Sequence, residues 1–448
     1  MSSSCAAASK TMNPAHERAE RLHSFGGSTV WEEFTPLAVK HKACNLGQGA
    51  PDFGTELFVR EAAAEVMMEQ TDHQYTRSQG HPRLVKQLAE TYSPWLERDV
   101  DPMSEIIVSC GATQTLFSIM EAFVNPGDEV ILLEPFFDIY PAQVTMAGGI
   151  CKYVPMRARG PEDGEKGTAG DFYLDMEEMR AALTEKTRLI ILNTPHNPYG
   201  KMFTLAELQE LADLVLEHPR VLVVNDEVYE HLYYNQKHAR LASLPGMFER
   251  SITVCSSGKT FNTTGWKIGW AISCAPIIQA IQLAHQWIIF STPTPLQAAV
   301  ARVLEKASEP YQGHDTYFDY LRGVYEAKKD HLLETLRLAG LNPIEPEGGF
   351  FIIANTSHII IPKKYLEPNE FDEGKAPPRD KAFCRYMTVE FGVTAIPPSS
   401  FYSEEHRHLA ANYARFACCK RDEDLHEARR RLVGMKDAQE ALRQQQQS

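Results

Sequence analysis

Five short, continuously apolar runs constrain the fold of this chain more than any other feature. They are rich in Val, Ile and Leu, and they do not alternate apolar with polar residues. Strands that are buried on both faces have this pattern, and most spacers between the runs are long enough for a helix. This pattern of runs and spacers therefore predicts an α/β domain with a largely parallel sheet covered by helices on both faces. The runs are residues 105–110, 130–133, 188–193, 220–225 and 252–255.

One of the spacers also carries the start signal of a helix. Thr204 and Glu207 have the spacing of a capping box, in which each side chain bonds the backbone N–H of the other residue. Leu208, Leu211 and Val215 then recur at the spacing of one helix face. The pattern predicts a helix between the third and fourth runs.

Polar and aromatic residues follow each run at what would be the same edge of the sheet. Ligands bind beyond the carboxyl ends of the strands in open α/β sheets. Taken singly, each residue has a structural explanation, because Asn-Pro makes turns, Asp caps helices and Phe pairs usually pack in cores. Their coincidence after five runs favours a ligand site, and the helix start after the first run could hold a phosphate. The candidates are Gly111, Ala112, Thr113, Phe137, Asn197, Asp226, Tyr229, Ser256 and Lys259.

Lys259 is the candidate for the reactive group of this site, and Lys267 adds a second cation further along the same stretch. A single lysine after a strand is usually a solvated surface residue. In a partly desolvated cleft, however, burial lowers the pKa of the ammonium group, and the neutral amine becomes a usable nucleophile and base. Because Lys259 follows a buried run, we predict that it is catalytic.

The stretch from Ser256 to Lys267 also carries a family resemblance. It contains Gly-Lys-Thr-Phe and continues into Thr-Gly-Trp-Lys-Ile-Gly-Trp. It resembles the cofactor-lysine motif of the class I aminotransferases, which use pyridoxal phosphate (PLP). Within that family it is similar to the branch of the kynurenine aminotransferases, glutamine–phenylpyruvate transaminases and cysteine-S-conjugate β-lyases. The resemblance extends over about residues 30–435.

The resemblance implies the PLP fold type I of aspartate aminotransferase, an α/β fold. In it a large domain holds a mostly parallel, seven-stranded sheet between helices, and a small α+β domain accompanies it. We expect residues 56–320 to form the large PLP-binding domain, and residues 1–55 and 321–448 to form the small domain with an N-terminal arm. Residues 362–379, rich in Lys, Pro and Glu, are predicted to be an exposed insertion.

The resemblance also implies a role toward PLP for each candidate. Lys259 would be the lysine that carries the cofactor. Asp226 would keep the pyridine nitrogen protonated, and Phe137 would stack on the ring. Tyr229 and Asn197 would bind the ring oxygen. The residues implied for the phosphate are Gly111, Ala112, Thr113, Ser256 and Lys267, with Tyr75 of the partner subunit in a homodimer.

The substrate contacts follow from the same resemblance. Arg415 would bind the α-carboxylate through its paired donors, and Asn197 would contribute to this site. Trp31 and Gly49 match the segment that covers the substrate in the family. No motif position offers a second arginine for a dicarboxylic substrate. The aromatic wall of the pocket would consist of Trp31, Phe137, Tyr140 and Phe350.

Such a pocket suits a bulky neutral side chain. We therefore predict a ping-pong aminotransferase that moves the amino group of kynurenine, phenylalanine, tryptophan, methionine or glutamine to a 2-oxo acid, and specifically a kynurenine–oxoglutarate transaminase. Two positions depart from the common pattern of the family. Tyr199 is the third residue of Asn-Pro-Tyr-Gly, and Ser291 stands where relatives can carry a histidine facing the substrate. Because of these two departures, the sequence does not identify the preferred amino donor.

Three alternatives remain. A cysteine-S-conjugate β-lyase would share the cofactor chemistry and differ mainly in the leaving group of its substrate. A non-catalytic, aminotransferase-like ligand sensor usually has an attached DNA-binding domain, for which about 25 uncommitted N-terminal residues leave little room. A nicotinamide-dependent dehydrogenase would need a Gly-x-Gly-x-x-Gly after the first strand, and the chain lacks it there.

Composition narrows the remaining possibilities. The formal net charge of −14 argues against a nucleic-acid partner, and the chain has no apolar run long enough for a membrane helix. Nine cysteines without paired spacing indicate neither disulfides nor a metal site, and they favour a reducing compartment. Residues 1–25 read as a polar arm without the apolar core of a signal peptide. We expect a cytoplasmic location, with a mitochondrial one left open.

Overall fold

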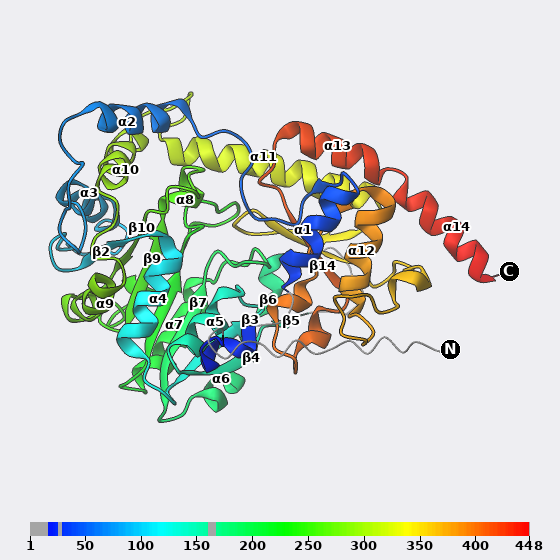
Figure 1. Cartoon of the computed structure of the whole chain (residues 1–448), viewed down its shortest axis with the longest axis horizontal. Coiled ribbons are helices and arrows are strands. Elements are labelled where there is room, and N and C mark those ends of the chain that lie inside the picture. The colour runs from blue at the N-terminus through cyan, green and yellow to red at the C-terminus, as the bar shows by residue number, and fades with distance from the viewer. Residues whose placement is uncertain (1–16, 26–28, 160–166, 448) are drawn as a thin grey trace, which may run out of the picture.

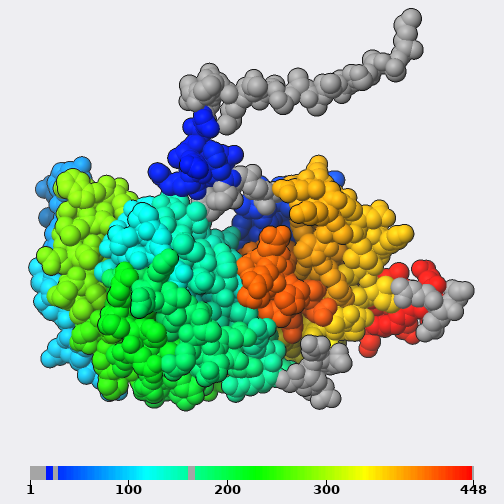
Figure 2. Space-filling model, turned by 90° about the horizontal axis from the view of Figure 1, so that it is seen from below, coloured from blue at the N-terminus to red at the C-terminus, as the bar shows by residue number. Residues whose placement is uncertain are grey.

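The computed structural model describes residues 17–25, 29–159 and 167–447 (Figure 1). Residues 1–16 of the predicted arm lie outside the described residues. The rest of the arm contains the 3₁₀ helix η2 (Glu20–Phe25), which contacts α5 (Ile139–Met146). Figure 2 shows this blue segment beside the cyan surface of the larger part of the molecule. None of the helices in the described ranges is both long and apolar enough to cross a membrane.

The larger part is built around a mixed sheet of seven strands in the order β2-β10-β9-β8-β7-β3-β4. All neighbouring strands are parallel except β10, which pairs antiparallel with β2 and β9. The five apolar runs are all strands of this sheet, so the predicted α/β fold is confirmed. The strands are β2 (Ile106–Ser109), β3 (Glu129–Glu134), β4 (Ile150–Pro155), β7 (Thr187–Asn193), β8 (Leu222–Asp226), β9 (Ser251–Ser256) and β10 (Gly269–Ile272).

Two strands, β4 and β10, were not among the predicted runs. β4 lies at the edge of the sheet and contains Lys152, so its apolar pattern is interrupted. β10 has only four residues and starts at Gly269. A Cβ atom at Gly269 would lie 2.5 Å from the backbone N of Ala112, which explains why a glycine begins this strand. Short or edge strands do not need the long apolar run of a central strand.

Alternate residues of the central strands pack against helices on opposite faces of the sheet. Leu189 and Ile191 of β7 face a cluster with α4, α5 and α9, whereas Ile190 and Leu192 face a cluster with α6 and α7. The predicted capping box of Thr204 starts α7. The helices of the larger part are α2 (Leu57–Met68), α3 (Pro82–Tyr92), α4 (Gly111–Phe123), α5, α6 (Met176–Ala182), α7 (Leu205–Leu216), α8 (Ser257–Thr260), α9 (Ala275–Ile288) and α10 (Thr294–Ala307).

The smaller part contains a three-stranded antiparallel sheet in the order β11-β12-β14. The helix α11 (Tyr317–Leu338) runs between the two parts (Figure 1). The N-terminal β1 pairs in parallel with β13, which places residues 44–45 in this part. The predicted domain boundaries stay a prediction. The other elements are α1 (Val30–Lys40), β1 (Cys44–Asn45), β11 (Asn342–Ile344), β12 (Phe351–Asn355), α12 (Arg379–Phe391), β13 (Val393–Thr394), β14 (Tyr413–Ala417), α13 (Asp422–Leu432) and α14 (Met435–Gln447), with the small pairs and turns β5 (Arg157–Ala158), β6 (Phe172–Tyr173), η3 (Ala169–Asp171), η4 (Leu241–Ser243), η5 (Lys363–Tyr365), η6 (Pro398–Phe401) and η7 (Arg407–Ala410).

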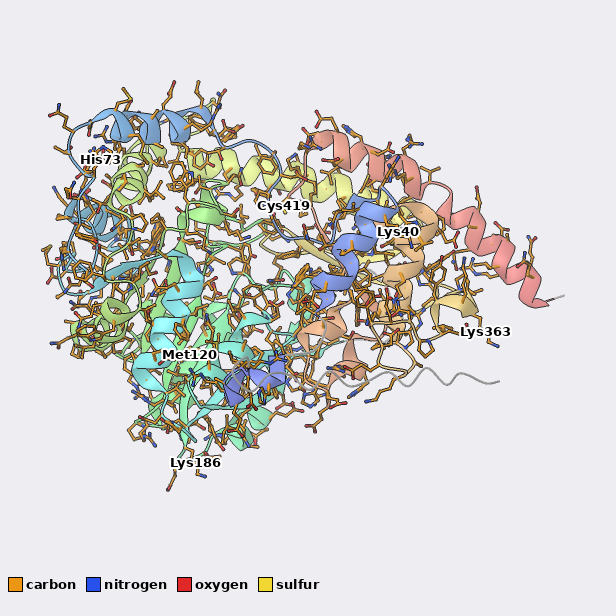
Figure 3. All side chains as sticks on the ribbon, viewed as in Figure 1. Lys40, His73, Met120, Lys186, Lys363 and Cys419 are labelled. Carbon is orange, nitrogen blue, oxygen red and sulfur yellow. The ribbon has the colours of Figure 1, made fainter. Side chains whose placement is uncertain are left out.

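The predicted insertion at residues 362–379 lies on the outside of the smaller part, where Figure 3 labels Lys363. It is nevertheless anchored. Asp372, whose side chain is 3% exposed, accepts hydrogen bonds from Arg385 of α12 at 2.7 and 2.9 Å. Arg385 also donates to Glu33 of α1 at 2.5 Å. The insertion is thus joined to α12 and α1 by a buried ion-pair network.

Candidate active site

A cavity of about 490 Å³ lies at the carboxyl ends of the sheet strands. Its lining comes from α1, the loop before α2, the starts of α4 and α5, the ends of β7, β8 and β9, and β12 and β14. Of the residues predicted to bind the cofactor or the substrate, all but Tyr75 and the two pocket-wall positions Phe350 and Ser291 line it. Those residues are Trp31, Gly49, Gly111, Ala112, Thr113, Phe137, Asn197, Asp226, Tyr229, Ser256, Lys259, Lys267 and Arg415.

Lys259 lies in α8, the single helical turn that follows β9. Its Nζ atom donates a hydrogen bond to the carbonyl of Gly49 at 2.8 Å and lies 5.3 Å from the ring centre of Phe350. Burial lowers the pKa of Lys259 below its ordinary value, and the positive charges of Arg415 and Lys267 act in the same direction. A larger share of this amine is therefore neutral and able to accept a proton or attack a carbonyl carbon.

Asp226 is the last residue of β8 and is buried. Its Oδ2 accepts a hydrogen bond from the Tyr140 hydroxyl at 2.7 Å, and its Oδ1 accepts one from the N–H of Val228 at 3.3 Å. Burial raises the pKa of Asp226 to about 6, although the bond from Tyr140 opposes that shift. A positively charged group beside Asp226 would favour the ionised carboxylate. Tyr140, predicted as part of the aromatic wall, is thus also the hydrogen-bond partner of Asp226.

The start of α4 forms a cradle suited to an anion. Gly111 has a φ of +77°, and a Cβ atom there would lie 3.2 Å from Nζ of Lys267. No side chain caps the first turn of α4, so the N–H groups of Ala112 and Thr113 are available at the positive end of the helix. Ser256 and Lys267 line the same side of the cavity. This donor set fits the phosphate of PLP.

Arg415 is a buried cation without an anion beside it. Its side chain lies in β14 and is 2% exposed. Nη1 donates to Oδ1 of Asn197 at 3.2 Å, Nη2 donates to the carbonyl of Gly47 at 2.7 Å, and Nε is left without a partner. Burial lowers the pKa of Arg415 to about 10. Among the described residues, none forms an ion pair with this guanidinium, so a substrate carboxylate would supply its missing partner.

Aromatic rings and a close backbone approach shape the rest of the cavity. Nε1 of Trp31 donates to Oδ2 of Asp138 at 2.8 Å, which joins α1 to the start of α5. A Cβ atom at Gly49 would lie 2.2 Å from Cζ of Phe351, so only glycine fits there. The prediction that Phe350 lines the pocket is wrong, because its ring is fully buried and Phe351 lines the cavity instead. Consecutive strand residues face opposite ways, and the sequence does not show which one turns inward.

Three other predicted positions lie outside the cavity lining. Tyr75 is 83% exposed and packs edge-on against Phe290 at 5.1 Å between ring centres. Tyr199 is buried, stacks on Phe172 at 3.9 Å and hydrogen-bonds to the Tyr402 hydroxyl. Ser291 does not line the cavity within this chain. Tyr199 is therefore a packing residue of the loop that carries Asn197.

Neither Asp138 nor Asn193 was predicted as a site residue from the sequence, although both line the cavity. Asp138 lines the cavity through its bond to Trp31, and its adjacency to Phe137 was the only signal in the sequence. Asn193 accepts the N–H of Asn197 at 2.7 Å and donates to the carbonyl of Asp226 at 2.8 Å. It thereby fixes two neighbouring site residues relative to each other.

Known proteins of similar sequence identify the class of protein to which this chain belongs. The family model for aminotransferase class I and II matches residues 41–432. The kynurenine–oxoglutarate transaminase of Dictyostelium discoideum is 44% identical over 95% of this chain and 98% of its own length. Kynurenine–oxoglutarate transaminase 3 of Homo sapiens is 39% identical over 89% of this chain and 86% of its own.

Solved structures agree. Bna3p, a putative kynurenine aminotransferase from Saccharomyces cerevisiae, superposes with a TM-score of 0.89 at 34% identity, covering 94% of this chain and 99% of that one. YbdL of Escherichia coli, described as having a methionine aminotransferase function, gives a TM-score of 0.81 at 32% identity, covering 93% and 99%. The chain belongs to the class I and II aminotransferases, and it is a transaminase of the PLP-dependent type.

Proposed function

We propose that this chain is a cytoplasmic, homodimeric kynurenine–oxoglutarate transaminase that also accepts other aromatic or bulky neutral amino acids. The buried, unpaired guanidinium of Arg415 carries this proposal. It is the only arginine among the described residues that line the cavity, which suits a substrate with one carboxylate near the reacting carbon. The aromatic lining and the names of the most similar relatives support the kynurenine-type donor.

We assign the cofactor contacts as follows. The N-terminus of α4 with Ser256 and Lys267 would hold the phosphate of PLP, and Phe137 would cover one face of its ring. Asp226 would face the ring nitrogen, and Tyr229 and Asn197 would face the ring oxygen. When bound, PLP delocalises the electron pair that is released when the Cα–H bond of an amino acid breaks. The lining residues that support this assignment all surround one cavity.

Each of the residues that line the cavity would have its own role in the reaction. Arg415 and Asn197 orient the substrate carboxylate, which fixes the position of the Cα–H bond. The lowered pKa of Lys259 would let its Nζ accept the Cα proton and deliver it to a carbon of the bound cofactor. Asp226 in its ionised form stabilises positive charge on the ring nitrogen. Product release followed by an oxo acid substrate gives ping-pong kinetics.

The homodimer part of the proposal is supported by an exposed apolar surface. Leu283 and Trp287 of α9 are 60% and 85% exposed, and Phe290 just after this helix is 59% exposed. Tyr75 packs on Phe290 and is itself exposed. Apolar and aromatic residues gathered in this way are typical of protein interfaces. In a dimer, Tyr75 of the partner subunit would reach the phosphate.

A donor panel tests the proposal. The purified protein should show a visible-edge absorbance band that shifts when kynurenine, phenylalanine or methionine is added. Turnover with 2-oxoglutarate should be far faster from these donors than from aspartate. An absent band would refute the cofactor site, and a ranking led by aspartate would refute the substrate class. Sedimentation that finds active monomers only would refute the dimer, and cell fractionation checks the location.

A further inference from the structure

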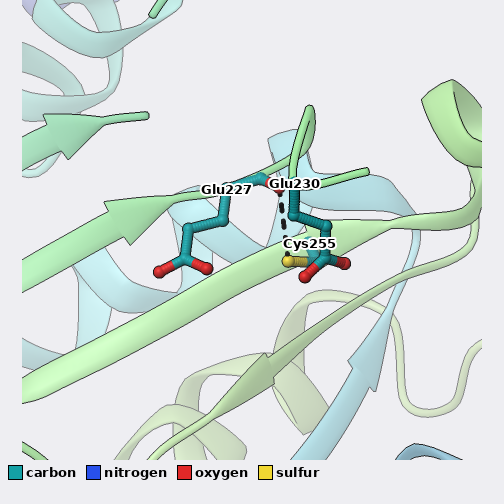
Figure 4. Close-up of side chains that lie close together, drawn as sticks. All are labelled: Glu227, Glu230 and Cys255. Carbon is teal, nitrogen blue, oxygen red and sulfur yellow. Dashed lines mark hydrogen bonds between the residues drawn. The ribbon is translucent and has the colours of Figure 1, made fainter. Parts of the chain in front are cut away.

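A buried charge cluster lies directly behind the turn that carries Asp226 and Tyr229. Asp226 and Tyr229 line the cavity, whereas Glu227 and Glu230 of the same turn do not. Glu227 and Glu230 are 0% and 3% exposed, and both lie close to Cys255 of β9, whose thiol donates to the backbone carbonyl of Glu227 at 3.6 Å (Figure 4). The turn therefore presents one pair of side chains to the site and a second pair to the protein interior.

Arg240 joins the two interior carboxylates. It is 7% exposed, donates through Nη1 to Glu227 and donates through Nη2 to Oε2 of Glu230 at 2.6 Å. Its guanidinium also lies 4.7 Å from the ring centre of Trp95 and 5.3 Å from that of Tyr92. A planar fork with separate bonds to two carboxylates fixes their relative positions more firmly than a single point charge can.

Further bonds complete the cluster. Oε1 of Glu230 accepts the Tyr92 hydroxyl at 2.5 Å, and Oε2 of Glu227 accepts Nε2 of His238 at 2.9 Å. Burial alone would lower the pKa of Arg240, but the two carboxylates raise it above its ordinary value. Burial alone would raise the pKa of Glu230, but Arg240 lowers it. The titratable side chains facing the cluster are Tyr92 of α3, His231 and His238 of the loop after β8, and Cys255 of β9.

A metal ion does not explain this cluster. Ligand atoms of Glu227, Glu230 and Cys255 lie within 4.8 Å of one another. However, the guanidinium of Arg240 already bonds both carboxylates. Burial, reinforced by the two carboxylates, also raises the pKa of the Cys255 thiol well above its ordinary value, which favours the protonated thiol in this cluster.

Within the turn, the carboxylates of the cluster lie only one or two residues along the chain from the side chains that line the cavity. The N–H of Glu227 donates to the carbonyl of Val254 at 2.8 Å, and the N–H of Glu230 donates to the carbonyl of Glu227 at 2.9 Å. Movement of either interior carboxylate would therefore tilt the turn and shift Asp226 or Tyr229. Residues that support such a turn from the protein interior set the geometry of the side chains that the turn presents to the cavity.

We propose that Arg240 is a positioning residue whose two ion pairs hold the turn of residues 226–230 in the conformation that presents its aspartate and tyrosine to the cavity. Its charge also offsets that of Glu227, which lies next to Asp226 and raises the pKa of that carboxyl. The inference rests on the cofactor site proposed above and adds to it a residue that touches neither cofactor nor substrate.

The test uses the cofactor as a reporter in the full-length holoenzyme. Arg240→Met removes the charge and both ion pairs, and Arg240→Lys keeps the charge without the fork. We expect Arg240→Met to raise the dissociation constant of PLP about tenfold or more, with a smaller rise for Arg240→Lys. Losing a positive charge should also move the pH midpoint of the cofactor absorbance upward, and adding Glu227→Gln should move it back.

Arg250→Met is the matched control. Arg250 is partly buried in the same part of the molecule, but it donates only to the backbone carbonyls of Val215, His218 and Val221. A merely structural role for Arg240 predicts that both Met variants lose thermal stability and leave the pH midpoint of the remaining holoenzyme unchanged. A midpoint that moves in Arg240→Met and not in Arg250→Met supports the positioning role.

If Arg240→Met does not fold, the comparison of Arg240→Lys with Arg250→Lys decides. Equal PLP dissociation constants in parent and Arg240→Lys would then overturn the inference. A parent protein without any cofactor absorbance would instead refute the proposed cofactor site. The two failures are therefore distinguishable in the same experiment.

Discussion

Arg415 and Arg240 are both buried, yet they differ in what surrounds them. Arg240 bonds two carboxylates, which raise its pKa, whereas Arg415 forms no ion pair with any described residue and burial lowers its pKa to about 10. Burial alone therefore does not identify a functional arginine. The difference lies in the missing partner, because an unpaired buried charge is unfavourable unless a ligand completes it. The turn of residues 226–230 separates the two environments, with the cavity in front and the charge cluster behind.

The largest expected effect belongs to the cavity side. Lys259→Ala should lower transamination by about 10²–10⁴-fold or more, because the other amine of the cavity lining, Lys267, is assigned to the phosphate. PLP should still bind through its phosphate and ring contacts. Steady-state kinetics and a cofactor titration measure the two properties separately. Turnover close to that of the parent would show that Lys259 is not the reacting group.

The next experiment contrasts Arg415→Met with Arg240→Met. Removing Arg415 should reduce turnover with all monocarboxylic donors about equally, by roughly 3–5 kcal/mol of lost carboxylate binding, and should leave the free energy of unfolding almost unchanged. Removing Arg240 leaves two buried carboxylates uncompensated and should lower the free energy of unfolding by roughly 3–5 kcal/mol.

Denaturant unfolding of the cofactor-free proteins and a donor panel measure both sides of this contrast. An Arg415 variant that selectively loses one donor would mean that this guanidinium recognises a side chain rather than the α-carboxylate. A large stability loss in that variant would instead show that Arg415 has a structural partner, and the contrast with Arg240 would then fail.

A smaller effect should appear in the pH dependence of stability. Burial raises the pKa of Asp226 from 3.8 to about 6 in the cofactor-free chain. Asp226 therefore contributes stability below about pH 4 that is lost as the pH rises through 6, and two pKa units correspond to about 3 kcal/mol. Relative to Asp226→Asn, the parent should lose up to that amount between pH 4 and pH 7. An unfolding difference independent of pH would contradict this.

Glu230→Gln should show the opposite trend and a smaller change. The charge of Arg240 lowers the pKa of Glu230 against the effect of burial. Glu230 therefore contributes stability above its ordinary pKa, and this contribution fades as the pH falls through the lowered value. The advantage of the parent over Glu230→Gln should thus grow as the pH rises. If the stability advantage of the parent fell with rising pH over both Asp226→Asn and Glu230→Gln, the distinction between the cavity side and the interior side of the turn would be contradicted.

The sequence predicts the residues that line the cavity far better than those of the charge cluster on the interior side of this turn. Asp226, Lys259 and Arg415 follow buried strands or match a family motif, so pattern and resemblance identify them. Arg240 follows no strand and belongs to no motif, and its contact with Glu227 depends on how the loop after β8 folds back. Sequence spacing carries little information about such contacts, because loop conformation is set by tertiary packing.

The same limit explains the errors in the pocket wall. The choice between Phe350 and Phe351 depends on the register of β12, which begins at Phe351 and pairs with β14. A change of one residue reverses the inward and outward faces of a strand. The five predicted strands were identifiable because both of their faces are apolar, so their identification did not depend on register.

The anchoring of α1 has a consequence for how substrates enter and leave. One side of this helix is held by the buried bond between Glu33 and Arg385, which also ties it to Asp372 of the insertion. Across the cavity, Trp31 is held to Asp138 by one hydrogen bond, which contributes about 1 kcal/mol. We therefore expect the cavity to open by separation of Trp31 from Asp138, with α1 and residues 362–379 moving together as one body. The residence time of the product would then depend on the few contacts of Trp31 across the cavity, which are its bond to Asp138 and the approach of the Arg415 guanidinium to 5.6 Å from its ring centre.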